Sequence, residues 1–174
     1  MRLASYHQWF EPHVKGWLEH AHEAAIKLID TSVAVDDWEP VTARAFYSSS
    51  VVDVFRVSYE MLEVWIRINW PDPVVRQEVF FVTLAKSVGG CICRYIALVE
   101  AKARDSMMQD ADATFFVPDA VCVAFNNISK VRTTLGELEQ FLNVRCQNLG
   151  GCSSSSGSRP ASYGTKRNPP PRCR

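Results

Sequence analysis

SSSVVDVFRVSYEMLEVWIRINW, then PDP, then VVRQEVFFVTLAKSVGGCICRYIALVEAKARD: this stretch, residues 48–105, decides the fold. Apolar residues recur in both halves at spacings of three and four, which places them on one face of a helix. In the first half they are Val51, Val54, Phe55, Leu62, Trp65 and Ile66, and in the second Val75, Val79, Val82, Ala85, Val88, Ile92, Tyr95, Ile96 and Val99. The pattern predicts two long amphipathic helices.

Residues 69–72 separate the two halves and are too few for anything but a sharp reversal. Asp72 is the predicted N-cap of the following helix, and Pro73 is its first residue, because proline at that position loses no intrahelical hydrogen bond. Before the first half stand three serines, Ser48 to Ser50, each able to cap a helix. The stretch therefore predicts an antiparallel helical hairpin.

One further helix is predicted on each side of the hairpin, over residues 8–30 and 118–143. Pro12 falls in the opening turn of the first, where it is tolerated. Trp9 and Trp17, only eight residues apart, predict heavy burial of that helix. The expected apolar faces comprise Phe10, Val14, Trp17, Leu18, Ala21, Ala25, Leu28 and Ile29 in the first, and Val121, Phe125, Ile128, Val131, Leu135, Leu138 and Leu142 in the last.

The segments between the helices carry their own signals. Residues 31–47 form a connector in which the isolated Trp38 is expected to fill a gap beside a helix end, and residues 106–117 read as a loop anchored by Phe115 and Phe116. Within the last helix, Asn126 and Asn127 are poor helix formers, so at least one of them is expected to make a specific hydrogen bond. The pair Gly89 and Gly90 favours close helix packing or a kink.

Composition limits the class of protein. A chain of 174 residues that is 47% hydrophobic can bury one core, which favours a single domain. The formal net charge of zero conceals an asymmetry, because residues 145–174 hold six basic and no acidic side chains, leaving 13 basic and 19 acidic ones in residues 1–144. Nucleic acid is therefore not an expected partner.

Residues 145–174 are rich in Ser, Gly and Pro and have too little apolar surface to offset the entropy cost of ordering, so they predict a disordered tail. Residues 1–144 are the predicted helical region. The fold class is thus all-α, an antiparallel bundle of about four long helices followed by a disordered tail.

No window holds 18 uninterrupted apolar residues, and the first residues lack the apolar core of a signal peptide. These features predict a cytoplasmic protein with no transmembrane segment and at most peripheral association with a membrane. Cys91 and Cys93 are two residues apart on a helix and cannot bond to each other or share one metal, so the thiols are expected to be free and reduced.

Neither catalysis nor metal binding is indicated. The cluster Glu19, His20, His22 and Glu23 puts its histidines on different faces, whereas metal-binding helices use spacings of three or four. The sequence also lacks a nucleophile elbow, a phosphate-binding loop and the zinc-protease helix motif. We expect no catalytic residue, metal or cofactor. The hypothesis that the chain is an enzyme has no group of residues in its favour.

Four landmarks carry a resemblance: WFEPHVKGWL at residues 9–18, SVVDVF at 50–55, PDP at 71–73, and Asn126-Asn127 followed by Val131-Arg132. In order and spacing they resemble the first Munc-homology region of the MUN domain in the Munc-thirteen (uncoordinated-thirteen) vesicle-priming proteins. The WPDP form is similar to the non-neuronal, secretory-granule branch. The resemblance covers residues 6–142 and stops near Asn143.

The resemblance implies a segment of an elongated rod of helical bundles that promotes SNARE assembly by acting on syntaxin. In synaptic members an Asn and a Phe on the SVVDVF helix help to open syntaxin. Counted without gaps, these places fall at Tyr59 and Leu62, so this chain departs from the synaptic pattern at both. With Asn126 and Asn127, they are the candidate partner-binding residues. The family's diacylglycerol- and calcium-binding modules lie outside this region.

Two hypotheses follow from the resemblance. The first is a non-enzymatic helical module that acts in regulated exocytosis by binding SNARE proteins such as syntaxin. The second keeps the fold but makes the chain a structural fragment of the MUN rod, whose partners are the remaining helices and which has no activity alone. The change of composition after Asn143 motivates the second, since it is typical of a truncated variant or gene model.

Overall fold

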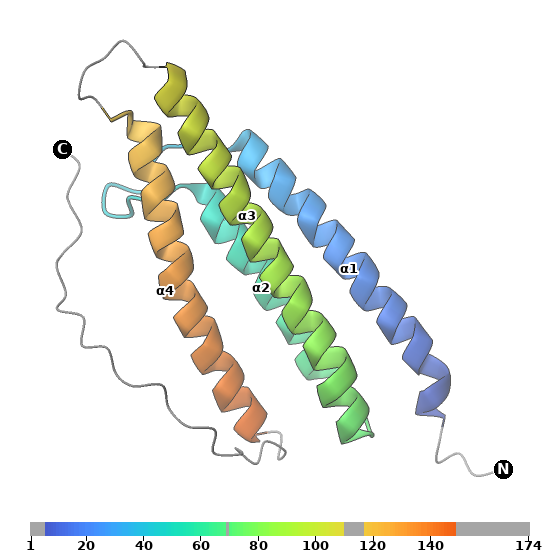
Figure 1. Ribbon diagram of the computed structural model, residues 1–174. Helices are drawn as coiled ribbons and strands as arrows, with labels where there is room; N and C mark the ends of the chain where they lie inside the picture. The colour runs from blue at the N-terminus through green and yellow to red at the C-terminus, as the bar shows by residue number, and fades with distance from the viewer. Residues whose placement is uncertain (1–5, 69, 110–116, 149–174) are drawn as a thin grey trace, which may run out of the picture.

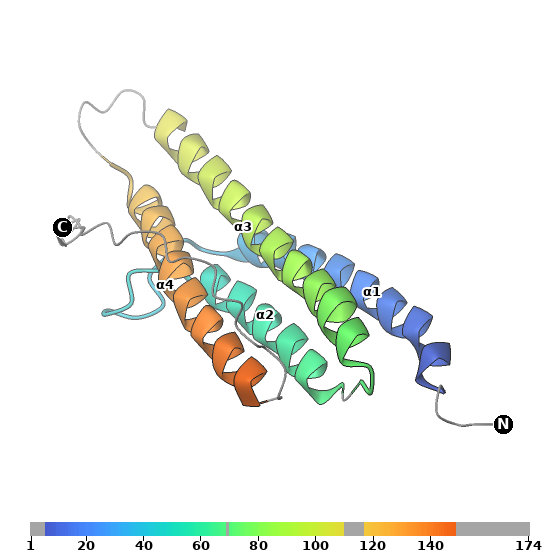
Figure 2. The same ribbon diagram turned by 60° about the horizontal axis from the view of Figure 1, so that its bottom comes forward.

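Four long helices run alternately up and down in the computed structural model, which describes residues 6–68, 70–109 and 117–148 (Figure 1). They are α1 (His7–Val35), α2 (Ser49–Arg67), α3 (Val82–Gln109), which follows a π-helical segment η2 (Val75–Phe81), and α4 (Asp119–Asn148). The all-α prediction is therefore confirmed. Both views place α1 and α4 on opposite sides of α3, with α2 completing the bundle (Figures 1 and 2).

The central helix is α3, which contacts α1, α2 and α4. This position explains why Val75–Met108 is, among the described residues, the one helical stretch long and apolar enough to cross a membrane by length and composition. A helix packed on several sides is apolar over most of its circumference. Leu84, Tyr95 and Val99 of α3 are buried in the core, as is Phe80 of η2.

The predicted hairpin joins α2 to η2 and α3. The Asp72 carboxylate accepts hydrogen bonds from the backbone N–H groups of Val74 and Val75, at 2.9 and 3.2 Å, and the helix begins at Pro73, as the sequence predicts. Ser48 is the N-cap residue of α2, but its side chain caps nothing. Its hydroxyl instead bonds to Asp36 and Asn127 in a buried network. The serine is therefore at the predicted N-cap position, but its side chain does not make the predicted capping bond.

In the hairpin's second half, the buried face differs from the predicted one. The sequence pattern runs one stripe through Val82 and Ala85, but both residues are exposed, and Phe80 and Leu84 occupy the buried positions. The buried residues of α3, namely Leu84, Val88, Cys91, Tyr95 and Val99, recur at spacings of three and four, so the observed face is regular and the predicted stripe departs from it at Val82 and Ala85.

Two predictions of heavy burial are wrong. Trp9 and Phe10 at the start of α1 are 75% and 55% exposed, because α1 turns Leu18, Ala25 and Ile29 toward its neighbours instead. In α4 the expected face is buried at Val121, Val131 and Leu138 but open at Phe125 and Leu135. Helices α1 and α4 lie at the outside of the bundle, so part of each predicted stripe stays in contact with solvent.

Helix ends differ from the sequence prediction by a few residues. Helix α1 continues to Val35, and α3 to Gln109, which shortens both predicted connectors. Helix α4 continues through Asn148, so the predicted boundary after residue 144 falls inside a helix. Residues 149–174, which make up most of the predicted tail, lie outside the described residues, as do Phe115 and Phe116.

Gly90 lies where α3 approaches α1. A Cβ atom at this position would be 3.2 Å from Cε1 of His22, whereas one at Gly89 would meet nothing within 4 Å. The expectation of close helix packing is therefore met at the second glycine of the pair.

Candidate functional site

A buried polar network joins the connector to α2, α3 and α4. The side chain of Asn127 accepts a hydrogen bond from the Ser48 backbone N–H and donates one to the Ser48 hydroxyl, both at 2.8 Å. The Ser48 hydroxyl in turn donates to the Asp36 carboxylate, whose other oxygen accepts the backbone N–H of Trp38 at 3.1 Å. Asn127 thus makes the specific hydrogen bonds that the sequence predicts for one of the two asparagines.

The network extends to α3 through a hydroxyl pair. Ser50 Oγ and Tyr95 Oη are 3.1 Å apart, and Ser50 Oγ lies 3.5 Å from Ser48 Oγ. Burial raises the pKa of Tyr95 well above its ordinary value, and the nearby Asp36 carboxylate raises it further. The phenol therefore stays protonated at neutral pH, as its hydrogen-bonding role requires. Sequence reasoning missed Asp36, Ser50 and Tyr95, because only the folded chain brings them together.

Trp38 fills the gap beside the end of α1, where it is buried, as predicted. Its backbone has φ of 59°, a left-handed conformation that non-glycine residues seldom adopt. The hydrogen bond that its N–H donates to Asp36 holds this conformation. The connector is therefore fixed to the bundle at both ends, by Trp38 and by Ser48.

The four candidate partner-binding residues lie in two different environments. Leu62 and Asn127 are buried, at 2% and 0% exposure, and belong to the core and the polar network. Tyr59 and Asn126 are half-buried and reach the surface. Their part in binding a partner stays a prediction.

Tyr59 packs where α2 meets α4. Its ring lies edge-on to that of Phe141, with 5.8 Å between the ring centroids. Burial, and secondarily the charge of Glu137, raise the pKa of Tyr59, which stays neutral at physiological pH. The side chain thus presents a half-covered aromatic ring with a hydroxyl, a type of surface that is common in protein interfaces.

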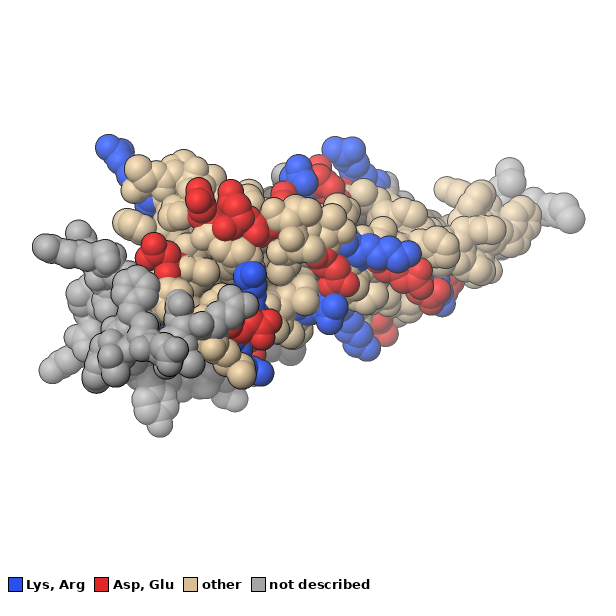
Figure 3. Space-filling model, turned by 90° about the horizontal axis from the view of Figure 1, so that it is seen from above, with Lys and Arg blue, Asp and Glu red and all other residues tan. Residues whose placement is uncertain are grey.

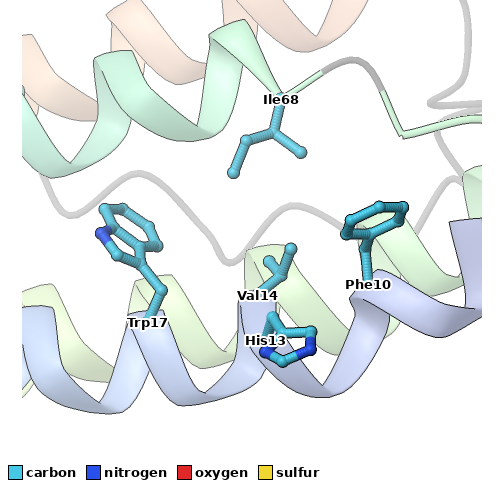
Figure 4. A pocket seen from close by; sticks show the side chains of 5 residues that line it. All are labelled: Phe10, His13, Val14, Trp17 and Ile68. Atoms are coloured by element: carbon cyan, nitrogen blue, oxygen red, sulfur yellow. The ribbon is translucent and has the colours of Figure 1, made fainter.

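An apolar pocket of about 190 Å³ opens between the first half of α1 and the end of α2. Figure 4 shows its lining: Phe10, Val14 and Trp17 project from α1 toward Ile68, which follows α2, and His13 lies beside Val14 on α1. Sequence reasoning placed Phe10 and Trp17 in the core and thereby missed this pocket. A signal was present, since both residues lie on one side of the helix face that contains Leu18 and Ile29.

Charges of both signs are interspersed on the face seen in Figure 3. The ion pairs within helices, such as Glu11 with Lys15 and Glu63 with Arg67, join residues four apart on exposed surfaces. Pairs of this kind contribute little to stability but keep a helical surface soluble.

Among the described residues, no group of three or more His, Cys, Asp or Glu side chains is placed to hold a metal ion. Cys91 and Cys93 form no disulfide within the described part of the chain. Burial raises the pKa of the Cys91 thiol to about 11, so it is protonated and unreactive at neutral pH. Cys146, Cys152 and Cys173 lie outside the described side chains.

These features define a class of protein, an all-α bundle with a hydrogen-bonded interior and apolar side chains that stay exposed on its surface. The comparison with protein families identifies the family of this chain within that class. The MUN domain family model matches residues 1–150, so this chain belongs to the MUN domain family. The resemblance inferred from the four landmarks is confirmed.

Curated relatives agree with the family assignment. The chain is 30% identical to human BAI1-associated protein 3 over 141 residues and 25% identical to rat protein unc-13 homolog D over 140 residues, covering 79% of this chain in each case. It is 23% identical to Drosophila melanogaster protein unc-13 homolog 4B over 145 residues. The matched region is only 11–12% of each relative's length. No solved structure matches the chain significantly.

Proposed function

We propose that this chain is a helical interaction module of a vesicle-priming factor, acting in regulated exocytosis by binding SNARE proteins, syntaxin among them. The observation that carries the proposal is membership of the MUN domain family by a bundle whose helices are apolar on faces that its own core does not use. SNARE proteins associate through amphipathic helices, and such helices bind by placing apolar residues in grooves between other helices.

Of the four candidate partner-binding residues, the proposal gives the two at the surface a direct role in binding and the two buried ones a supporting role. Tyr59 and Asn126 reach the surface and are the candidates for contact with a SNARE helix. Leu62 and Asn127 would act through the bundle, by fixing the positions of α2 and α4 beneath such a contact. The proposal includes a cytoplasmic location, peripheral to the plasma membrane or to secretory vesicles, and a non-enzymatic mode of action.

Binding of the full 174-residue chain to the immobilised cytosolic region of syntaxin, and to assembled SNARE complexes, tests the proposal. A full MUN rod from the same source is the positive control. We expect Tyr59→Ala to weaken binding by about tenfold, as truncation of an interface aromatic commonly does. Tyr47→Ala removes another half-buried ring, one packed beneath Lys130, and should leave binding unchanged. The proposal fails if the rod binds and this chain does not.

A second candidate is a structural role within a MUN rod. It is favoured by Phe125 and Leu135, which are 68% and 39% exposed on α4 although apolar side chains of this size usually pack against a neighbour. On this view the remaining helices of a rod cover them. Self-association of the isolated chain that disappears on co-expression with downstream MUN helices would favour this candidate, and a stable monomer with affinity for syntaxin would count against it.

A further inference from the structure

Buried side-chain atoms without a hydrogen-bond partner gather around the turn of the hairpin. Among the described residues, six buried side-chain nitrogen or oxygen atoms have no partner. Four of the six lie around this turn: Nδ1 of His7, Nε1 of Trp65, Nε1 of Trp70 and Nε of Arg76. Buried polar groups are nearly always paired in native proteins, so several unpaired ones at one place indicate a binding site.

The four side chains pack into one cluster. The Arg76 guanidinium lies over the Trp65 ring, 5.3 Å from its centroid, and His7 lies edge-on to Trp70, with 5.7 Å between the ring centroids. Trp65 and Trp70 also contact the adjacent phenylalanines at positions 81 and 80 of η2. In a π-helix, hydrogen bonds join residues five apart, so positions 76, 80 and 81 share one side. Both indoles therefore pack against the side of η2 that carries Arg76.

The chemistry of these atoms specifies the ligand. Indole and guanidinium nitrogens donate hydrogen bonds and cannot accept them. Arg76 joins no ion pair among the described residues, since the Asp72 carboxylate accepts the backbone N–H groups of Val74 and Val75 instead. A carboxylate supplies one negative charge and several acceptor sites, which match one guanidinium and two indole N–H groups. A phosphate monoester carries nearly two charges at neutral pH and exceeds the single positive charge.

The cluster has an outer and an inner part. Trp65 and Trp70 are 2% and 8% exposed, whereas Arg76 and His7 are half-buried and reach the surface. The apolar pocket lined by Ile68 adjoins the cluster, because the Ile68 carbonyl accepts the backbone N–H of Trp70 at 2.9 Å. A ligand therefore meets the flexible, charged Arg76 side chain first and the indole N–H groups behind it.

We propose that the cluster of Trp65, Trp70 and Arg76 binds one carboxylate of another protein, borne by an Asp or Glu side chain or by a chain terminus. Arg76 provides the charge, and the two indoles add directional hydrogen bonds. The site is separate from the surface at Tyr59, which packs against α4. The inference thus goes beyond the proposed function and does not depend on it.

Titration of the full 174-residue chain with two capped amino acids tests the inference. Acetyl-aspartate amide carries the carboxylate, and acetyl-asparagine amide is its neutral match. The indole N–H resonances in proton–nitrogen NMR spectra, assigned with Trp65→Phe and Trp70→Phe, report binding at neutral pH. We expect acetyl-aspartate amide to move both resonances downfield with a dissociation constant at least about tenfold lower than that of the asparagine probe. Resonances that ignore both probes, as in a site that holds only water, or that respond equally to both would overturn the inference.

Two further probes distinguish the sources of the acidic group. Acetylglycine presents a chain-terminal carboxylate, and acetyl-phosphoserine amide presents a phosphate on a side chain. Tighter binding of acetyl-aspartate amide than of acetylglycine would assign the site to a side chain, and the reverse order would assign it to a chain terminus. Tighter binding of the phosphoserine probe than of both carboxylates would overturn the assignment of a carboxylate.

Matched variants locate the site. Arg76→Gln should weaken acetyl-aspartate amide by at least about tenfold, whereas Arg56→Gln, at an exposed arginine of α2 paired with Asp53 at 3.2 Å, should have no effect. Arg76→Lys keeps the charge without the planar fork and should fall between Arg76→Gln and the wild type. Circular dichroism verifies the helical fold of each variant. Equal effects of Arg76→Gln and Arg56→Gln would overturn the inference, as would an equal response of the Trp9 indole, which is 75% exposed.

The outcome is separable from that of the proposed function. Carboxylate binding that requires Arg76, in a chain with no affinity for syntaxin, would support this site while the SNARE assignment fails. Syntaxin binding that requires Tyr59, with indole resonances that ignore the carboxylate probes, would support the proposed function while this inference fails.

Discussion

The two ends of α2 are held in different ways. At its N-terminal end, Ser48 and Ser50 belong to a network in which Asp36, Tyr95 and Asn127 all make hydrogen bonds; we call this the connector end. At its C-terminal end, aromatic rings meet around the hairpin: Trp65 lies 5.0 Å from Phe81 and Trp70 lies 4.9 Å from Phe80, centroid to centroid. We call these four rings the hairpin end.

The hairpin end is poor in directional bonds. The indole N–H groups of Trp65 and Trp70 are buried and have no hydrogen-bond partner among the described residues. The two ends of α2 therefore show two ways of holding a helix in place within a bundle. Large rings supply burial and tolerate small displacements, whereas a buried amide bonded to a backbone N–H permits only one arrangement of the connector. The four predictions below test this division.

Replacing Phe80 by Ala should have the largest effect. Its ring is 1% exposed and packs edge-on against Trp70, so its loss should lower the free energy of unfolding by about 3–5 kcal/mol. Phe125→Ala, at a phenylalanine 68% exposed on α4, is the matched control and should stay within about 0.5 kcal/mol. Urea unfolding followed by circular dichroism measures both. Similar losses for the two variants would contradict the packing described for the hairpin end.

Asn127→Ala should come next, with a loss of about 2–3 kcal/mol, because the Ser48 N–H would be left buried without a partner. Its neighbour Asn126 is half-buried and makes none of these bonds, so Asn126→Ala should cost less than about 1 kcal/mol. The same unfolding measurement applies, with hydrogen exchange at the Ser48 amide as a second readout. A Ser48 amide that stays protected in Asn127→Ala would show that the network does not hold the connector.

Alkaline pH should lower the free energy of unfolding, because α3 buries two ionisable side chains: the thiol of Cys91 and the phenol of Tyr95, which belongs to the connector end. Burial raises the pKa of Cys91 from its ordinary value of 9.0 to about 11, so folding keeps the thiol protonated. This contribution is fully present below pH 9 and is lost as pH rises through 11, by an amount on the order of 2 kcal/mol. Tyr95 acts in the same direction above its ordinary pKa of 10.0.

Unfolding free energies at pH 8 and pH 10.5 measure the alkaline effect, and Cys91→Ala should reduce the difference between them. Alkylation at pH 8 gives an independent check, because the exposed Cys93 should react much faster than Cys91. Comparable alkylation rates for the two thiols would contradict the burial of Cys91.

The smallest expected effect is at the glycine pair in the first third of α3. Gly89→Ala should raise stability by about 0.5–1 kcal/mol, since alanine favours the helix and its Cβ would meet nothing within 4 Å. Gly90→Ala should gain less, because its Cβ would press against the His22 ring at 3.2 Å. Thermal unfolding of the two variants side by side decides the order. A larger gain at Gly90 would mean that α1 and α3 are farther apart there than described.

Much of the fold could be predicted because it is local. The spacing of Val51, Val54 and Trp65 defines the inner face of α2 whatever surrounds it, and Asp72 followed by Pro73 marks a helix start through bonds within four residues. The specific role expected of the asparagine pair is likewise confirmed at Asn127. Membership of the MUN domain family follows from the sequence as well.

The candidate surfaces could not be predicted in the same way. Trp17 and Phe125 are as apolar as any core residue, and their exposure depends on which sides of α1 and α4 are covered by other helices. On α3, likewise, Leu84 is buried and Val82 is exposed, and the contacts of this helix with α1, α2 and α4 decide between these two apolar residues.

By itself, then, the sequence determined the number, polarity and approximate bounds of the helices and the family to which they belong, because these depend on periodicity and capping within a few residues. Tertiary structure alone decided which apolar faces are buried, and that Asp36, Ser48, Ser50, Tyr95 and Asn127 meet. Those outcomes depend on contacts between residues up to 79 positions apart, which no local pattern encodes.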